Sequence, residues 1–190
     1  MPKILVIDKK INRFNNTLKI EGDKSLSIRC VLLASQAKGK SKIKNLLKSD
    51  DVLSTLKCLK KLGVKIKYVK NTCEIIGLGL NGFNYKKNLV LDAGNSGTLG
   101  RLIIGLLIHS DKKIKIIGDE SLSKRDFQRI INPLQKFGAT IKATSGKLPI
   151  HIIGTNKPTP ISYFEKKGSA QCKSAVMLAA LNTNGETIIK

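Results

Sequence analysis

The sequence contains no tryptophan, and aromatic residues make up only 4% of its 190 residues. Acidic residues are also scarce, since 13 Asp and Glu stand against 35 Lys and Arg, for a net charge of +22. Long apolar runs are missing: Leu102–Ile108 lies between Arg101 and His109 and is far shorter than the roughly 18 residues of a membrane helix. The apolar segment after Met1 is too short for a secretory signal. We therefore expect a cytoplasmic protein without a membrane partner.

Cysteine and histidine are too few and too scattered for a zinc site, which needs closely spaced pairs of ligands. No C-x-x-C pair occurs and no cysteine has a histidine nearby; the six residues are Cys30, Cys58, Cys73, Cys172, His109 and His151. We expect reduced thiols, mostly buried, and no bound metal.

The positive charge is spread along the chain and forms no single block. Only five of the cations are arginine, and the lysines run from Lys3 to Lys190. Proteins that bind nucleic acids gather their cations on one face, often beside aromatic side chains that stack on bases. A solvated lysine surface fits this sequence better, so we expect no nucleic-acid partner. The positive field still favours small anions in any cleft.

Apolar residues at 41% and charged residues at 25% indicate a globular chain, and that chain repeats itself. Three small residues, spaced 72 positions apart, each open an apolar stretch and have a cation four positions later: Ser25 with Arg29, Gly97 with Arg101, and Ser169 with Lys173. The first two repeats continue with a short strand, an amphipathic helix and a closing Ile-Ile-Gly. The strands are Ile43–Leu47 and Ile114–Ile117, the helical segments Asp50–Gly63 and Arg125–Gly138, and the closing motifs Ile75–Gly77 and Ile152–Gly154.

This order predicts an α/β fold of β-α-β-α-β-β units related by pseudo-threefold symmetry, with the third unit truncated. The units cover about 19–90, 91–165 and 166–190, after a separate strand segment at 1–18. The first helix of each unit is apolar on most faces, so we expect it inside the domain and the lysine-rich second helix outside. These inner helices are Leu26–Ala37, Leu99–Ile108 and Ala175–Leu181.

All three inner helices begin after small or polar residues, such as Gly22–Ser25, Asp92–Thr98 and Gly168–Gln171. Free backbone N–H groups and the helix dipole make such a helix start a site for anions. Simple N-capping would explain one of these starts. Three related starts, each with a cation one turn later, instead predict a shared cleft for phosphate or carboxylate ligands.

Four segments of this chain resemble motifs of EPSP synthase, the 3-phosphoshikimate 1-carboxyvinyltransferase family. They are Asp23–Arg29, Leu91–Thr98, Gly118–Arg125 and Ser169–Ser174, and the resemblance covers essentially Met1–Lys190. It implies the enolpyruvyl transferase fold and transfer of the enolpyruvyl group of phosphoenolpyruvate to the 5-hydroxyl of shikimate 3-phosphate, in the shikimate pathway that leads to chorismate and the aromatic amino acids. It also implies no cofactor and a monomeric full-length enzyme.

Members of that family are more than twice as long as this chain. The resemblance therefore implies an incomplete N-terminal domain, whose strand segment 1–18 packs in the other domain. The acid–base residues lie beyond Lys190, and no catalytic residue is expected in this chain. We expect the chain alone to be marginally stable and inactive.

The resemblance also implies the residues that contact each substrate. Those for shikimate 3-phosphate are Lys24, Ser25, Arg29, Ser169, Ala170 and Gln171, and those for phosphoenolpyruvate are Lys24, Gly97, Arg125 and Gln171. Asn95, Thr98 and Arg101 are expected to shape the site. Ala170 is a serine in some members, so a hydroxyl contact is lost there or moves to the backbone. A side chain at Gly97 should crowd phosphoenolpyruvate or an inhibitor in its place, such as glyphosate.

Two alternatives remain open from the sequence. The related enolpyruvyl transferase that acts on UDP-N-acetylglucosamine typically has Lys-Asn where this chain has Lys24-Ser25, and a reactive cysteine near Gly118–Arg125, where this chain has none. A non-catalytic module that binds anions or nucleic acid is the alternative from another class.

Overall fold

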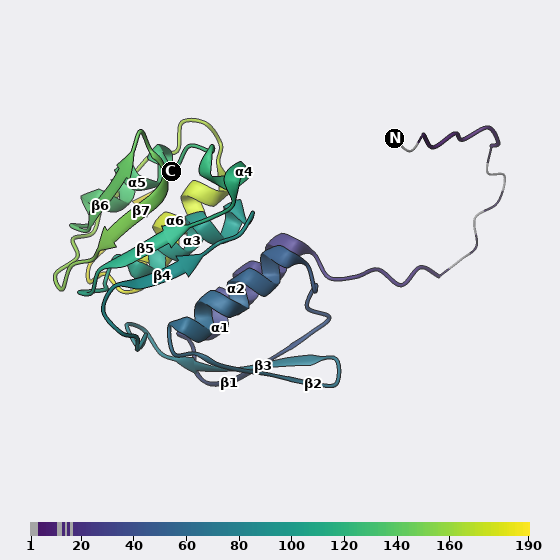
Figure 1. Ribbon diagram of the computed structural model, residues 1–190, viewed down its shortest axis with the longest axis horizontal. Coiled ribbons are helices and arrows are strands. Elements are labelled where there is room, and N and C mark those ends of the chain that lie inside the picture. Colours follow the sequence, from purple (N-terminus) through teal and green to yellow (C-terminus); the bar gives the residue numbers. More distant parts are fainter. Residues whose placement is uncertain (1–3, 11–12, 14, 16) are drawn as a thin grey trace.

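The computed structural model describes residues 4–10, 13, 15 and 17–190. From Lys24 on, its helices and strands fall into three consecutive units, and the described residues before Lys24 form an extended trace (Figure 1). In the first unit, two helices lie on one face of an antiparallel sheet with the order β1-β3-β2. The helices are α1 (Lys24–Gln36) and α2 (Asp50–Lys61), and the strands are β1 (Lys38–Lys44), β2 (Lys65–Val69) and β3 (Thr72–Leu78).

The second unit has a four-stranded sheet with the order β4-β5-β7-β6, in which β4 and β5 are parallel and the other pairs antiparallel. Its elements are β4 (Leu89–Asp92), α3 (Gly97–Leu107), β5 (Ile114–Ile117), α4 (Glu120–Ser123), α5 (Gln128–Lys136), β6 (Thr140–Thr144) and β7 (Lys147–Ile153). The third unit comprises β8 (Ser162–Tyr163), α6 (Ala170–Ala180) and β9 (Ile188–Ile189), with β8 and β9 parallel.

The second unit confirms the predicted β-α-β-α-β-β order, with the short α4 added before α5. The first unit contains the same elements without a leading strand among the described residues. The spacing of 72 would place that strand at 17–20, where the chain has no regular structure and Leu18 and Ile20 are exposed. The predicted strand segment 1–18 falls partly on residues 1–3, 11, 12, 14 and 16, outside the described ones. Its described residues form no strand.

The amphipathic patterns of the outer helices produce the expected packing. In α2, Val52, Leu56 and Leu59 are buried while its lysines face solvent, as the 3–4 spacing of apolar residues predicts. The glycines that follow α2 and α5, Gly63 and Gly138, have φ of +92° and +102°. Such positive φ angles are cheap for glycine, which explains why both helices end there.

The inner helices form the centre of the core. Helix α3 is buried along its length except at Arg101, and it packs closely against α6. A Cβ on Gly105 would lie 2.3 Å from the carbonyl oxygen of Ala175, so only glycine permits this approach. Three of the cysteines, Cys58, Cys73 and Cys172, are buried, as expected, whereas Cys30 is exposed.

Several predicted boundaries were wrong. Helix α5 begins at Gln128 and not Arg125, because the Asp126 carboxylate accepts the Gln128 N–H at 2.7 Å and holds a turn before the helix. Strand β1 ends at Lys44, since Asn45 has a φ of +54°. The inner helices start earlier than the apolar pattern indicates, at Lys24, Gly97 and Ala170.

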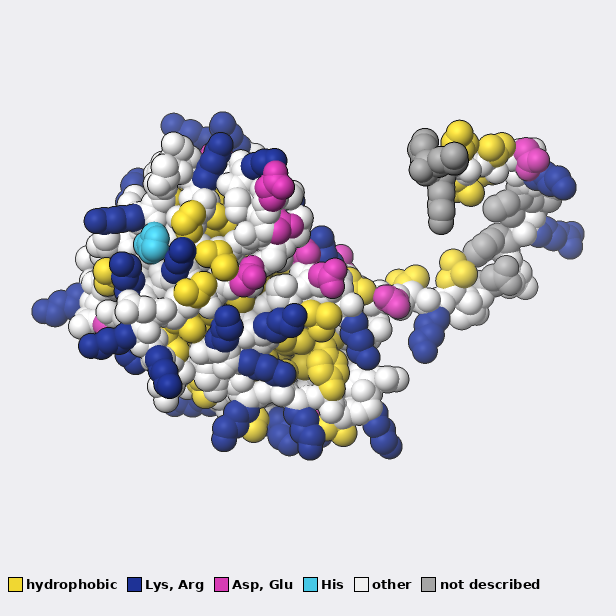
Figure 2. Space-filling model, viewed as in Figure 1, with side chains coloured by type: hydrophobic (Ala, Val, Ile, Leu, Met, Phe, Trp, Pro, Cys, Tyr) yellow, Lys and Arg dark blue, Asp and Glu magenta, His cyan; other side chains and the backbone are white. Residues whose placement is uncertain are grey.

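The surface is strongly basic, and its Lys and Arg side chains are dispersed over the face shown in Figure 2. Within the described part of the chain, no helix has both the length and the apolar character required to cross a bilayer.

Candidate functional site

Helices α1, α3 and α6 each begin at a capped N-terminus. The side chains of Asp23, Ser96 and Ser169 accept hydrogen bonds from backbone N–H groups three residues later, at 2.7, 3.2 and 3.2 Å. Each cap satisfies one of the four N–H groups that a helix start leaves unpaired. The remaining N–H groups and the positive end of each helix dipole stay available to an anion.

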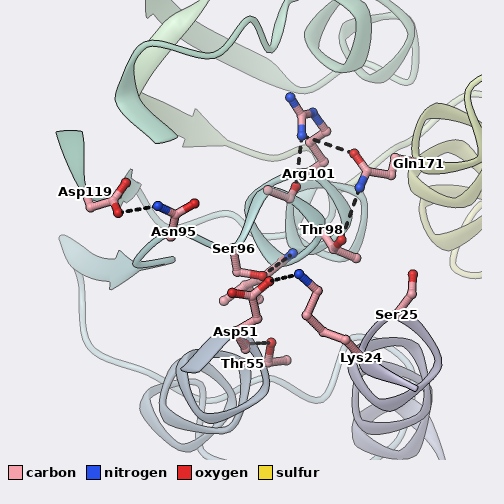
Figure 3. A network of polar contacts seen from close by, with 12 residues as sticks. Lys24, Ser25, Asp51, Thr55, Asn95, Ser96, Thr98, Arg101, Asp119 and Gln171 are labelled. Atoms are coloured by element: carbon pink, nitrogen blue, oxygen red, sulfur yellow. Dashed lines mark hydrogen bonds and ion pairs between the residues drawn. The ribbon is translucent and has the colours of Figure 1, made fainter. Parts of the chain in front are cut away.

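The three helix starts border one polar depression of about 220 Å³. Its lining residues are Lys24, Asp51, Asn95, Gly97, Thr98, Arg101, Arg125 and Gln171. Lys24 comes from α1, Thr98 from α3 and Gln171 from α6 (Figure 3). Gly97 is the first residue of α3. This confirms the expectation that the inner helices direct their N-termini at a common cleft.

Arg101 connects α3 to α6 across this depression. Its Nη1 donates to the Gly97 carbonyl oxygen at 3.3 Å and to Gln171 Oε1 at 3.1 Å. Gln171 Nε2 in turn donates to Thr98 Oγ1 at 3.1 Å (Figure 3). The Arg101 guanidinium also lies 4.9 Å from the ring centroid of Phe127. Gln171 is therefore held from two sides, with its side chain fixed before any ligand arrives.

Arg125 is positioned by a separate chain of hydrogen bonds. Its Nη2 donates to Asn95 Oδ1 at 2.8 Å. Asn95 Nδ2 in turn donates to Asp119 Oδ2 at 2.6 Å (Figure 3). Burial lowers the pKa of Arg101, and the nearby Arg125 cation lowers that pKa further. Two guanidinium groups thus lie near each other in a partly desolvated place, where a bound anion would relieve their repulsion.

Lys24 forms an ion pair that the sequence did not predict. Its Nζ lies 3.1 Å from Asp51 Oδ2, and the Asp51 side chain is only 18% exposed. Asp51 stands in the first turn of α2, where the positive end of the helix dipole favours an acidic side chain. The sequence did carry a signal for this pair. Asp50 and Asp51 begin α2, the outer helix of the unit that also contains Lys24. The ion pair directs the Lys24 ammonium into the depression.

Gly97 leaves space that any other residue would fill. A Cβ at this position would lie 2.7 Å from Arg101 Nη1 and 3.0 Å from Arg125 Nη1. Both neighbours are the ends of flexible side chains, so they could move aside at little cost in stability. They would then no longer hold their present positions around the depression.

The remaining predicted residues lie next to the depression and do not line it. Arg29 donates through Nη1 to Ser25 Oγ and through Nη2 to Ser174 Oγ at 3.4 Å. It lines a neighbouring groove between α1 and α6. Ser169 caps α6, and Ala170 is exposed in its first turn. The structure thus brings Lys24, Asn95, Gly97, Thr98, Arg101, Arg125 and Gln171 together, and places Ser25, Arg29, Ser169 and Ala170 beside them.

Comparisons with known proteins agree on one family. The family model described as EPSP synthase (3-phosphoshikimate 1-carboxyvinyltransferase) matches residues 8–190. A curated 3-phosphoshikimate 1-carboxyvinyltransferase from Ruthia magnifica is 48% identical over 100% of this chain and 43% of its own length. One from Syntrophomonas wolfei is 44% identical over 95% of this chain and 43% of its own.

A solved structure of EPSP synthase from Acinetobacter baumannii superposes with a TM-score of 0.86 at 36% identity, covering 91% of this chain and 39% of that one. The chain therefore spans about 40% of the length of the relatives that it matches.

Proposed function

The chain belongs to the EPSP synthase family, and on that premise we propose that it forms the part of a 3-phosphoshikimate 1-carboxyvinyltransferase that holds shikimate 3-phosphate and one side of phosphoenolpyruvate. The complete enzyme transfers the enolpyruvyl group of phosphoenolpyruvate to the 5-hydroxyl of shikimate 3-phosphate and releases phosphate. The reaction proceeds by addition and elimination through a tetrahedral intermediate, as the resemblance implies.

One observation carries the proposal: three helix starts and the cations Lys24, Arg101 and Arg125 border the same depression. Both substrates bear a phosphate and a carboxylate. Helix N-termini and charge-assisted hydrogen bonds are the features that bind such groups strongly. A depression with this lining suits two adjacent, multiply charged anions better than a neutral ligand.

We assign shikimate 3-phosphate to the side formed by α1 and α6. Lys24, Ser25 and Arg29 lie along the first turns of α1, and the guanidinium fork of Arg29 suits a carboxylate. Ser169, Ala170 and Gln171 surround the start of α6 and offer backbone N–H groups to the phosphate. Ala170 contributes only its backbone, so Ser169 supplies the hydroxyl at the start of α6.

We assign phosphoenolpyruvate to the space between Gly97 and Arg125, with Lys24 and Gln171 contacting both substrates. Asn95 orients Arg125, while Thr98 and Arg101 orient Gln171. We assign these three residues the role of shaping the site, because they act through the binding residues. A Lys24 ammonium between two anions would reduce their mutual repulsion.

The residues described here supply binding and not proton transfer. Asp51 is the carboxylate that lines the depression, and it is paired with Lys24. We assign the general acid and base to the part of the family's length that this chain does not span, so the chain alone is expected to bind substrate without turning it over.

Titration of the purified chain with shikimate 3-phosphate, followed by heteronuclear NMR, tests this assignment. We expect saturable shifts at Lys24, Ser25 and Gln171, and at least about tenfold weaker binding of shikimate, which lacks the phosphate. No saturable binding of shikimate 3-phosphate would contradict the proposal. A preference for UDP-N-acetylglucosamine, or for an oligonucleotide with steep salt dependence, would favour one of the alternatives.

Gly97→Ala is expected to weaken phosphoenolpyruvate binding by about fivefold or more, because the new methyl group displaces the guanidinium groups of Arg101 and Arg125. The unfolding free energy should change by less than about 1 kcal/mol, since flexible side chains can move. Ligand titration and chemical denaturation measure the two quantities.

Gly100→Ala is the matched control for this substitution, because it adds the same methyl group in the same helix. Its Cβ would meet the Phe127 ring at 3.3 Å and not a guanidinium group, so it can reach the depression only indirectly, through the Arg101 cation above that ring, and the expected loss of affinity is smaller than for Gly97→Ala. Equal losses of affinity in both variants would show that the effect is not local to Gly97.

A further inference from the structure

Glu165 carries a buried carboxylate in the segment that joins β8 to α6. Its side chain is only 3% exposed, and an isolated charge is costly to bury. Three donors satisfy this carboxylate. The Tyr163 hydroxyl donates to Oε2. Arg129 Nη2 donates to Oε1 at 2.7 Å, and the backbone N–H of Lys167 donates to the same oxygen at 3.0 Å.

The three donors come from different parts of the fold. Tyr163 ends β8, Arg129 lies in the first turn of α5, and Lys167 belongs to the loop that enters α6. Burial alone would raise the pKa of Glu165, but the hydrogen bonds from Tyr163, Lys167 and Arg129 lower that pKa to about 2. The carboxylate is therefore ionised at neutral pH, and it joins β8, α5 and the loop before α6.

This loop leads directly into residues assigned to shikimate 3-phosphate. Ser169 caps α6, and Gln171 lies in its first turn. Hydrogen bonds with Arg101 and Thr98 fix Gln171 from the side of α3, and the bonds to Glu165 fix the entry to α6 from the side of α5. Because hydrogen bonds weaken steeply away from their preferred geometry, a phosphate that binds backbone N–H groups depends on where this entry lies.

Glu165 also pairs with a third guanidinium group near the depression. Burial is the main cause of the lowered pKa of Arg101, and the cations of Arg125 and Arg129 contribute to it. Arg129 itself lies outside the lining of the depression. Its ion pair with Glu165 therefore offsets part of the repulsion among the three guanidinium groups.

We propose that Glu165 is a positioning residue, which fixes the start of α6 so that Ser169 and Gln171 offer a prepared site to the phosphate of shikimate 3-phosphate. This role rests on the function proposed above, and Glu165 acts through α6 without touching either substrate. Its charge and its hydrogen bonds have opposite effects on binding. A negative charge near an anion site weakens binding, so loss of the charge alone should tighten it. Loss of the hydrogen bonds frees the start of α6 and should weaken binding.

Two variants with side chains of similar length separate these effects. Glu165→Gln removes the charge but keeps an oxygen for Arg129 and the Lys167 N–H, and its amide can donate to the Tyr163 oxygen. Glu165→Met removes the charge together with every acceptor oxygen. In calorimetric titration with shikimate 3-phosphate, Glu165→Gln should bind within about twofold of wild type or more tightly. Glu165→Met should bind about fivefold or more weakly.

Glu74→Met is the matched control for the loss of a paired carboxylate. Glu74 lies on β3 and outside the lining of the depression, and its side chain is only 19% exposed. Lys40 and Lys42 lie 3.3 and 3.9 Å from its two oxygens. The affinity of Glu74→Met for shikimate 3-phosphate should stay within about twofold of wild type.

Amide hydrogen exchange without ligand separates positioning from overall stability. The N–H groups of Cys172 and Lys173 donate to the Oγ and the carbonyl oxygen of Ser169. Glu165→Met should speed exchange of these two groups by about fivefold or more relative to Val176, farther along α6, whereas a general loss of stability would speed all three alike. Tyr163→Phe removes only one donor and should have the same local effect by about twofold or more. It decides the question if Glu165→Met does not fold.

Equal affinity of Glu165→Gln and Glu165→Met for shikimate 3-phosphate would overturn the positioning role, because charge would then be the only contribution. Uniformly faster exchange along α6 would also overturn it, since Glu165 would contribute to stability alone. If the unmodified chain binds no shikimate 3-phosphate, the proposed function fails. The exchange rates at Cys172 and Lys173 still show in that case whether Glu165 fixes the start of α6.

Discussion

Replacing Lys24 by alanine is expected to weaken the binding of shikimate 3-phosphate by at least about tenfold, because hydrogen bonds to a charged group contribute about 1.5–3 kcal/mol each. The substitution also removes the ion pair in which Lys24 Nζ lies 3.1 Å from Asp51 Oδ2, so Asp51 loses its partner. An unpaired carboxylate beside the depression repels the incoming anion, so both effects act in the same direction. NMR titration of wild type and variant measures the ratio of dissociation constants.

Lys40→Ala is a closely matched control for this prediction. Lys40 pairs with Glu74 at 3.3 Å, and its side chain is 51% exposed, against 54% for Lys24. Both substitutions remove one positive charge and one surface ion pair, which contributes at most about 1 kcal/mol to stability. Equal affinity of the two variants for shikimate 3-phosphate would mean that only the overall charge matters, and the assignment of Lys24 would be wrong.

The repeat spacing predicted the second unit nearly completely, because each element carries its own local signal. Apolar residues at 3–4 spacing indicated the face that α2 buries, and glycine marked where α2 and α5 end. The four residues of β5 lie where the sequence placed them. Such features depend on neighbours in the chain, so a pattern can show them without tertiary information.

The predictions that failed depend on contacts between distant residues or on single side-chain bonds. The Asp126 bond that delays the start of α5 has no periodic signature. The first unit lacks a described leading strand, although the spacing of 72 would place one at 17–20. A strand needs a partner to satisfy its backbone groups, and the local sequence does not determine whether that partner is present.

The residues of the candidate site also divide into those with a local signal in the sequence and those that depend on contacts between distant residues. Lys24, Gly97 and Gln171 could be predicted because each lies at a recognisable helix start, and equivalent starts converge when a fold has internal symmetry. Asp51 and Phe127 were missed as site residues. Each acts by supporting a cation from another helix, and that relation appears only in the folded structure.

Phe127→Ala is expected to lower the unfolding free energy by about 3–5 kcal/mol, the usual cost of removing a fully buried phenylalanine ring. Phe127 is 0% exposed and is the N-cap residue of α5. Phe137, at the other end of α5, is equally buried, and Phe137→Ala should cost a similar amount. Chemical denaturation measures both losses, which report on the core and not on the site.

The leucine variants separate the two phenylalanines, because leucine keeps the apolar contacts and much of the volume. Only Phe127 lies under the Arg101 guanidinium, 4.9 Å from ring centroid to cation. Phe127→Leu removes that support, loosens the bond from Arg101 to Gln171, and should weaken phosphoenolpyruvate binding by about threefold or more. Phe137→Leu should lower the unfolding free energy by a comparable amount and leave the affinity for phosphoenolpyruvate unchanged. If both leucine variants lower affinity equally, Phe127 contributes to the core alone, and Arg101 is held by its hydrogen bonds to Gly97, Gln171 and Asp126.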